Sequence, residues 1–293
     1  MHRHALLVLA AHVAAAQAPR ALPPRTDELA ALNDEFASAA SLARWKEFHT
    51  AEGWPSMTRS MAVDSASGEL RLEPGTSGWY ADFHAPFLFR EVTGDFQVTT
   101  RLRADGPDGE VPTTPWSLAG LMVRAPRAVT PATWTPGGEA WLFLTTGVAG
   151  APSTPVFETK TTVASRSALR LHPARAGWVE LRIVRRGADF ELLTRYDGEA
   201  WEVRERFHRP DLPATVQVGI NAYTDWNSAA ALHGDPFRFN TVPFQGGSPG
   251  LHLRVDWIRF ARPEGTVPLS TEAACAAPPS GRGWRSGGCR PRG

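Results

Sequence analysis

Short runs of alternating apolar and polar residues cover most of the chain from about residue 68 to about residue 262. In the run 96–103, for example, Phe96 and Val98 flank Gln97, and the same order continues to the end of the run. Successive side chains of a β-strand point to opposite faces, so a period of two predicts half-buried strands. Helical periodicity is almost absent, and no segment recurs at a fixed length. The pattern therefore predicts an all-β protein.

Gly, Pro, Asp or Ser residues bound the runs, which predict about a dozen strands. The predicted strands are 32–36, 45–48, 68–73, 87–93, 96–103, 117–123, 140–146, 156–163, 178–184, 190–196, 201–207, 216–223 and 251–260. The turn at Thr93-Gly94-Asp95 predicts a hairpin, and Asp197-Gly198 predicts another. Strands of this number and spacing predict a two-sheet antiparallel β-sandwich of the jelly-roll type.

The N-terminus has the pattern of an export signal. Basic residues 2–4 precede an apolar stretch at 5–16, and Ala16-Gln17-Ala18 matches the small-x-small pattern that signal peptidase cleaves. A short N-terminal helix is the alternative. We predict a signal peptide at 1–18, a proline-rich linker at 19–28, one domain at 29–263 and a Pro/Gly/Arg-rich tail at 264–293. No later run has the roughly 20 apolar residues that a spanning helix needs. We therefore expect a secreted protein, extracellular or periplasmic, without membrane insertion.

Both cysteines of the chain, Cys275 and Cys289, lie in the predicted tail. An exported chain passes through an oxidising compartment, and neither cysteine has the CxxC spacing of a metal site. We therefore predict that they form a disulfide with each other. The alternative is that the tail is an attachment or sorting segment whose cysteine is used elsewhere.

Charge excludes one class of partner. The chain has 31 Lys and Arg residues against 30 Asp and Glu residues, and its formal net charge is +1. Such a balance produces no single-sign field of the kind that attracts nucleic acid. We expect a monomer that does not bind nucleic acid.

Six segments, in order, resemble the concanavalin A-like lectin/glucanase superfamily. They are GELRLEPGTSGWY, FLFREVTGDFQVTTRL, LAGLMVR, WVELRIVRRGADFELLTRYDGEAW, VQVGINAYT and VDWIRF. More narrowly, the series resembles a family of secreted bacterial domains of unassigned function, which are also found attached to glycosidases. The resemblance covers about residues 29–263 and implies a concanavalin A-like sandwich that handles saccharides.

Catalysis by members of this superfamily would need two carboxyl groups about 5–9.5 Å apart. The resemblance to laminarinase-like members implies a Glu-x-Asp-x-x-Glu run, and the chain has none. The remaining candidate pair is Glu139 and Glu158, with Lys160 or Arg124 available to shift a pKa. The alternative is that both glutamates are solvated charges at strand edges. We therefore expect a non-catalytic protein.

The sequence offers few metal ligands. The histidines of the predicted domain lack the close spacing of a zinc site. Asp105, Asp108 and Glu110, in the segment ADGPDGE, could contribute oxygen ligands to calcium. A solvated loop is the alternative, and no other cofactor is predicted.

Aromatic residues give the stronger functional signal. An aromatic ring stacks on the C–H face of a pyranose, while amide and carboxylate groups bond its hydroxyls. Candidates at strand ends or in loops are Trp79, Tyr80, Trp116, Trp134, Trp141, Tyr223 and Trp226, beside Asn221, Asp225 and Asn227. The alternative is that most of them are core residues. Four other tryptophans, Trp45, Trp178, Trp201 and Trp257, are expected to pack or to cover a sheet edge.

Alternation also predicts which face of the sandwich binds. Five apolar residues of two predicted strands are predicted to face the core, so that their neighbours in the chain face the opposite side of the sheet. The five are Leu121, Val123, Val218, Ile220 and Ala222. The predicted ligand-binding residues are Arg124, Glu158, Lys160, Asn221, Tyr223, Trp79, Trp141 and Trp226.

Three functions remain open. A secreted saccharide-binding protein would have an open cleft lined by tryptophan, and a glycoside hydrolase or polysaccharide lyase would have two acids facing each other in that cleft. A structural or surface-assembly protein would have the cleft filled by its own loops, with the insert 229–250 as the best candidate plug.

Overall fold

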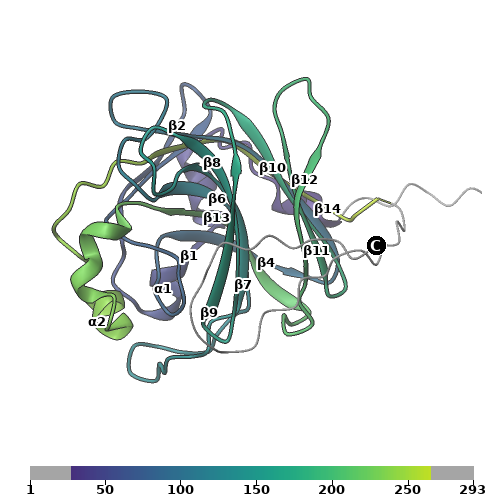
Figure 1. Cartoon of the computed structure of the whole chain (residues 1–293). Coiled ribbons are helices and arrows are strands. Elements are labelled where there is room, and N and C mark those ends of the chain that lie inside the picture. Colours follow the sequence, from purple (N-terminus) through teal and green to yellow (C-terminus); the bar gives the residue numbers. More distant parts are fainter. Residues whose placement is uncertain (1–27, 265–293) are drawn as a thin grey trace, which may run out of the picture.

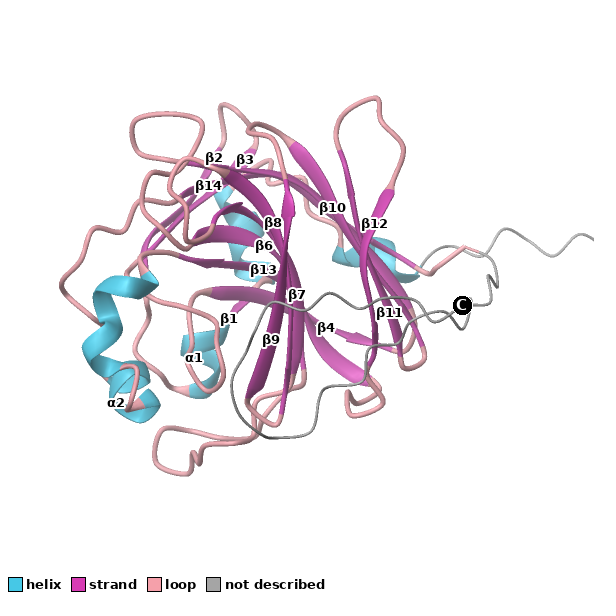
Figure 2. Cartoon of the chain, viewed as in Figure 1, coloured by secondary structure: helices cyan, strands magenta, loops and turns pink. Residues whose placement is uncertain are grey.

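The computed structural model describes residues 28–264, in which two antiparallel sheets of seven strands pack face to face (Figures 1 and 2). The predicted all-β, two-sheet sandwich is confirmed. The predicted signal peptide, most of the linker, the tail after Glu264 and both cysteines lie outside the described residues. Within residues 28–264, no helix is both long enough and apolar enough to cross a bilayer.

The first sheet has the order β1 (Lys46–Glu47), β4 (Phe87–Thr93), β13 (Thr215–Tyr223), β6 (Ser117–Arg124), β7 (Trp141–Val148), β8 (Pro155–Val163) and β9 (Arg166–Pro173). The second has the order β12 (Glu202–His208), β11 (Asp189–Arg195), β10 (Val179–Arg186), β5 (Phe96–Asp105), β14 (His252–Ala261), β3 (Glu69–Pro74) and β2 (Thr58–Asp64). The helices are η1 (Glu28–Leu32), η2 (Ala39–Arg44), α1 (Phe48–Glu52), η3 (Trp226–Leu232) and α2 (Pro236–Thr241). Both α-helices lie beside the first sheet, on the side away from the second (Figure 1).

The main core fills the space between the sheets. The first sheet contributes Leu121 and Ile220, and the second contributes Val98 and Leu102, all of them fully buried. Full burial of such a side chain stabilises the fold by about 1.5–3 kcal/mol. This burial explains why apolar residues alternate with polar residues or glycine along β5 and β13.

The turn at Gly94 does not close a hairpin, contrary to the prediction. β4 pairs with β1 and β13 in the first sheet, whereas β5 pairs with β10 and β14 in the second. The Gly94 amide donates to the carbonyl of Ala214, and the Gly187 amide donates to the Asp95 carboxylate. The turn therefore carries the chain from the first sheet to the second. β4 and β5 do not pair with each other, and each obtains its hydrogen bonds from other strands of its own sheet. The second predicted hairpin, at Gly198, joins the paired strands β11 and β12.

Three strand predictions need correction. The predicted strand 32–36 is instead the end of η1 followed by one isolated bridge between Asp34 and Ile258. A continuous strand is interrupted there because Phe36 has a positive φ of 45°. The edge strands β2 and β9 were not predicted, because their side chains are mostly half-exposed or exposed and show no clear alternation.

Three glycines of the first sheet lie where neighbouring strands come very close. A Cβ atom built on Gly219 would overlap the carbonyl oxygen of Leu88, and similar overlaps occur at Gly120 and Gly147. The overlapping atoms belong to the backbone of a paired strand, which cannot move aside as the end of a flexible side chain can. These positions therefore require glycine.

Gly219→Ala is therefore expected to lower the free energy of unfolding by at least about 1–3 kcal/mol, the usual cost of forcing an extra carbon into a packed site. Urea unfolding followed by tryptophan fluorescence measures the change. Gly234→Ala is the matched control, because no atom lies within 4 Å of its Cβ position. Equal midpoints for the two variants would contradict the requirement.

Candidate functional site

The face of the first sheet that points away from the main core carries the predicted binding residues. Five of the predicted residues project from this face: Asn221 and Tyr223 of β13, Arg124 of β6, and Glu158 and Lys160 of β8. Their chain neighbours, including Leu121 and Ile220, lie in the main core instead. We call this surface the outer face of the first sheet.

The outer face is buried under other parts of the same chain. Segment 75–86, which follows β3, lies across it, and the Lys160 ammonium donates to the Trp79 carbonyl over 3.0 Å. The Trp79 ring lies 5.9 Å from that of Trp141, and both side chains are fully buried. The open tryptophan-lined cleft expected of a binding protein is therefore absent from the described residues. Pro74 and Gly75 end β3 of the second sheet, and the chain then turns over the outer face of the first sheet.

The insert 229–250 forms a second layer over this cover. The Asn240 side chain donates to the carbonyl of Asp82 and accepts from the amide of His84. Trp226, which is half-buried, packs at 5.0 Å against Phe83. The predicted plug thus holds segment 75–86 in place and does not itself fill the sheet face.

Glu158, Lys160 and Tyr223 form the first polar cluster of the outer face, which we call the Glu158 cluster. The Tyr223 hydroxyl donates to one carboxylate oxygen, and the Lys160 Nζ atom lies 2.9 Å from the other. The ammonium also lies 5.0 Å from the Phe143 ring and 5.9 Å from the ring of Tyr80. Burial, together with Glu158, raises the pKa of Tyr223 well above 10. The phenol therefore stays protonated and acts as a donor.

Beside this cluster, buried polar groups have no protein partner among the described residues. They are both side-chain amide atoms of Asn221, the hydroxyl of Thr145 and the indole nitrogen of Trp141. Asn221, Gly120, Thr145 and Glu158 are register partners on four adjacent strands. Neighbouring strands lie about 4.8 Å apart, so the row extends about 14 Å across the sheet. A buried group without a partner costs about 1–3 kcal/mol, and a bound polar molecule would offset that cost.

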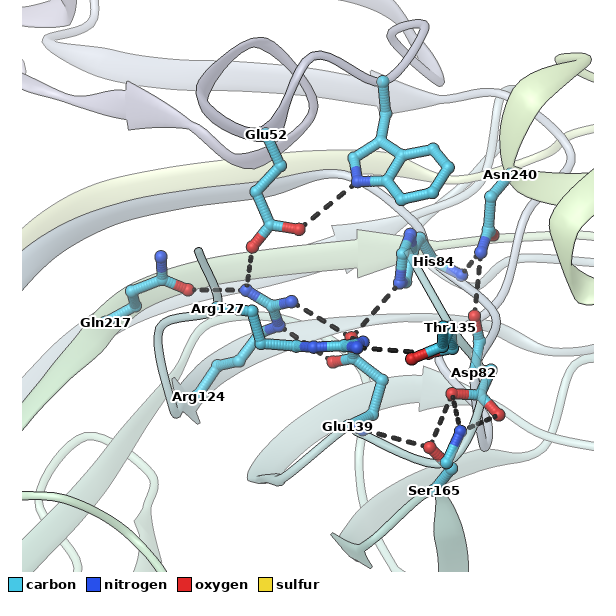
Figure 3. Close-up of polar contacts among 12 residues, drawn as sticks. Glu52, Asp82, His84, Arg124, Arg127, Thr135, Glu139, Ser165, Gln217 and Asn240 are labelled. Atoms are coloured by element: carbon cyan, nitrogen blue, oxygen red, sulfur yellow. Dashed lines mark hydrogen bonds and ion pairs between the residues drawn. The ribbon is translucent and has the colours of Figure 1, made fainter. Parts of the chain in front are cut away.

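Arg124 lies at the centre of a second polar cluster, the Arg124 network (Figure 3). Its guanidinium donates to the carboxylates of Glu139 at 2.9 Å and Glu52 at 2.6 Å and to the side-chain amide oxygen of Gln217 at 2.9 Å. Burial alone would lower the pKa of Arg124, but the two carboxylates raise it above its usual range. Burial would likewise raise the pKa of Glu139, but Arg124 and His84 hold it well below 4.5. Arg124 and Glu139 are therefore both charged at neutral pH.

Two buried histidines border the Arg124 network. The Nε2 atom of His84 lies 3.5 Å from the Glu139 carboxylate, and the Phe48 ring packs against both His84 and His49. Burial lowers the pKa of His49 from 6.5 to about 3, with smaller contributions from His84 and Arg124. His49 is therefore neutral at physiological pH.

The candidate catalytic residues Glu139 and Glu158 belong to different clusters. Arg124 and Arg127 both pair with Glu139, at 2.9 and 2.7 Å, and keep it ionised. A glycosidase general acid needs a raised pKa, so this environment does not suit proton donation. Neither glutamate is a solvated strand-edge charge, since both are fully buried.

The candidate calcium ligands do not converge. Asp105 and Glu110 both pair with Arg103, at 2.7 and 3.2 Å, and Asp108 is exposed. Among residues 28–264, no group of three or more His, Cys, Asp and Glu side chains is arranged to hold a metal ion.

The aromatic candidates divide by exposure. Tyr80 is 44% exposed above the Glu158 cluster, whereas Trp116 and Trp134 are half-buried. The four tryptophans expected to pack do so: Trp45 stacks on Phe36, and Trp178, Trp201 and Trp257 stack with Arg101, Arg182 and Arg259.

Sequence reasoning missed Thr145 and Glu52. Thr145 lies between Leu144 and Thr146, so alternation places it on the opposite face from these two neighbours. Only the strand register shows that it lies next to Glu158 on that face. Nothing in the sequence around Glu52 indicates that it pairs with Arg124.

Comparison with known proteins supports the fold. No protein-family model and no curated protein matches the chain. Among solved structures, a functionally unknown protein from Saccharomyces cerevisiae aligns with a TM-score of 0.50 and 17% identity, covering 76% of this chain and 99% of that one.

Two larger chains also align. The GH43 protein BlXynB from Bacillus licheniformis has a TM-score of 0.53 and 15% identity over 83% of this chain. A xylan beta-1,4-xylosidase from Bacillus halodurans C-125 has a TM-score of 0.51 and 14% identity, also over 83% of this chain. Each alignment covers only 41% of the larger protein. At these identities the likeness shows the fold alone.

Proposed function

We propose that the protein is a secreted, non-catalytic saccharide-binding β-sandwich of the concanavalin A-like type. One observation carries the proposal: the row of buried, unpartnered amide and hydroxyl groups of Asn221 and Thr145 beside Glu158 on a face rich in aromatic rings. Segment 75–86 covers these groups, so binding there requires this segment to move away from the face. Amide, hydroxyl and carboxylate groups bond adjacent sugar hydroxyls, while aromatic rings pack on the apolar face of a pyranose.

Two further points support this proposal. The aligned part of each Bacillus protein belongs to a chain described as a GH43 protein or a xylosidase, so a domain of this shape occurs in a saccharide-processing context. In addition, both glutamates proposed for catalysis are engaged in ion pairs, which favours binding over hydrolysis.

A glycan-array screen of residues 19–293, with reducing-sugar release assayed in parallel, tests the function. We expect binding without release of reducing sugar. Asn221→Ala should weaken binding at least about tenfold, because the two hydrogen bonds lost contribute about 1 kcal/mol each. Gln245→Ala, at an exposed position outside the outer face, is the control. Binding that is unchanged by Asn221→Ala would place the site elsewhere.

A structural or surface-assembly role is the second candidate, and the covered outer face favours it. Lys160 and Trp141 contact segment 75–86 directly, as expected of a face that is filled by its own chain. The two functions differ in one measurement: if no glycan is bound and no glycan raises the thermal midpoint, the structural role is supported.

A further inference from the structure

Building on the proposed function, we infer that segments 75–86 and 225–250 form a hinged lid over the outer face of the first sheet, with the Asp82 carboxylate as its latch. The lid keeps the face closed in the free protein and opens as one body when a ligand binds. Four features of the molecule support this assignment: the place where the lid joins the sandwich, its internal packing, its latch and the groups beneath it.

The lid joins the sandwich at one place, close to Thr224. Its two segments connect to the sandwich after β3, before β4, after β13 and before β14. The Ser77 amide donates to the Thr224 carbonyl over 2.9 Å, and the Gly250 amide donates to the Thr224 hydroxyl over 3.1 Å. The remaining connection is two residues away, where the Ala222 amide donates to the Pro86 carbonyl. Because all four connections meet at this end, which we call the hinge, the lid can rotate about it without stretching the chain.

The two segments of the lid pack on each other. Phe83 of the first segment lies 5.2 Å from Phe239 of the second, in a buried cluster that is separate from the clusters beneath it. Near the hinge, the Thr76 hydroxyl donates to the Asp225 carboxylate over 3.0 Å. These contacts lie within the lid, so its opening leaves them intact. The two segments are therefore expected to move together.

The end of the lid away from the hinge is held by the hydrogen bonds of a single turn. Asp82 accepts from the Ser165 hydroxyl at 2.5 Å and from the Gly137 amide at 3.0 Å, and the Ala81 amide donates to the Ser167 hydroxyl over 2.8 Å. Ser165 follows β8, and the register from β8 to β13 places it at the opposite end of the first sheet from the hinge. At about 3.3 Å per residue, the two ends are about 23 Å apart. Asp82 therefore latches the lid far from its hinge.

Opening of the lid has a cost and a gain. It would expose the fully buried ring of Trp79 and break the contacts of Lys160 with the Trp79 carbonyl and of His84 with the Arg124 network, so the closed form predominates without ligand. It would also uncover the Asn221 amide and the Thr145 hydroxyl, which have no partner among the described residues. A ligand that bonds these groups binds only the open form and shifts the equilibrium toward it.

Hydrogen exchange of residues 19–293, followed by mass spectrometry, tests the lid without any ligand. We expect the amides of both lid segments to exchange at least about tenfold faster in Asp82→Ala than in the wild-type protein, since opening becomes easier by about 1.4 kcal/mol. The amides of β6 and β13 should keep their wild-type rates. Lid exchange that is unchanged, accelerated in segment 75–86 alone or matched by equal acceleration in β6 and β13 would overturn a lid that opens as one body.

Two further variants separate the latch from general stability. Asp34→Ala removes a buried carboxylate that accepts from the Phe36 amide and the Trp45 indole, outside the lid, and should not accelerate lid exchange selectively. Ser165→Ala removes one donor to Asp82 and should accelerate both lid segments to a smaller extent, which tests the latch even if Asp82→Ala does not fold. Equal effects of Asp34→Ala and Asp82→Ala on the lid would overturn the latch.

A glycan that binds on the array tests the link between the lid and the proposed function. Asp82→Ala should bind it at least about tenfold more tightly, because the apparent affinity follows the fraction of open protein. Saturating glycan should also accelerate exchange in both lid segments of the wild-type protein. Unchanged or slower exchange would overturn control of the site by the lid, while saccharide binding would stand. The absence of all glycan binding would remove the proposed function alone, since exchange in Asp82→Ala tests the lid without a ligand.

Discussion

Arg124→Met is expected to lower the free energy of unfolding by about 3–5 kcal/mol. Arg124 is fully buried and is the shared partner of Glu52 and Glu139. Methionine would fill a similar volume but would leave two carboxylates in the interior without their main counter-charge. Arg127 still reaches Glu139, so the loss should be felt most strongly at Glu52. Guanidinium unfolding monitored by circular dichroism measures the difference.

Removing the charges together distinguishes charge from packing. The triple variant Glu52→Gln, Glu139→Gln and Arg124→Met has no buried carboxylate in the network and should recover much of the stability lost by Arg124→Met alone. If the triple variant is less stable than the single variant, the network contributes through shape and hydrogen bonds and not through charge balance.

Acidification is expected to destabilise the protein in two steps. His49 is held neutral in the folded state, where its pKa is lowered from 6.5 to about 3 mainly by burial. Between these values the unfolded chain binds a proton that the folded chain does not, so stability falls by about 1.4 kcal/mol per pH unit. Above pH 6.5 this loss is absent. Glu139, whose pKa is held well below 4.5, adds a further loss as pH drops below that value.

Unfolding free energies measured from about pH 8 to about pH 4 test the first step. His49→Leu should reduce the slope between about pH 6 and about pH 4.5, because the side chain can no longer bind a proton. His208→Leu is the control, since that imidazole is 54% exposed and pairs with Asp189 at the surface. A slope that His49→Leu leaves unchanged would show that other groups control the acid response.

The fold was largely predictable because the main core lies between two sheets. Val98 and Leu102 on one sheet and Leu121 and Ile220 on the other are buried at alternating positions, which is the signal that the sequence displays. Strand pairing was less predictable. The turn at Gly94 has hairpin chemistry, but β4 and β5 lie in different sheets, and their partners β13 and β14 come from far along the chain.

The candidate site was predictable only in part. Alternation places Asn221 and Tyr223 opposite the core, because strand geometry is local. The cover by segment 75–86 depends on contacts such as that of Lys160 with Trp79, for which the sequence carries no periodic signal. Such long-range contacts decide whether a tryptophan near a turn is exposed. The sequence therefore predicted Trp79 and Trp141 to lie near a ligand, whereas in the structure both are buried.

The position of β14 constrains how the chain reaches its folded state. This strand, the last of the described chain, lies in the middle of the second sheet between β5 and β3, and its residue Ile258 bridges to Asp34. During synthesis on the ribosome, β5 is therefore completed long before its central partner exists. Such distant pairing carries a high loop-closure cost and slows folding. Until residue 261 is available, the edges of β5 and β3 that β14 will occupy remain open, and open edges of this kind can pair with other strands.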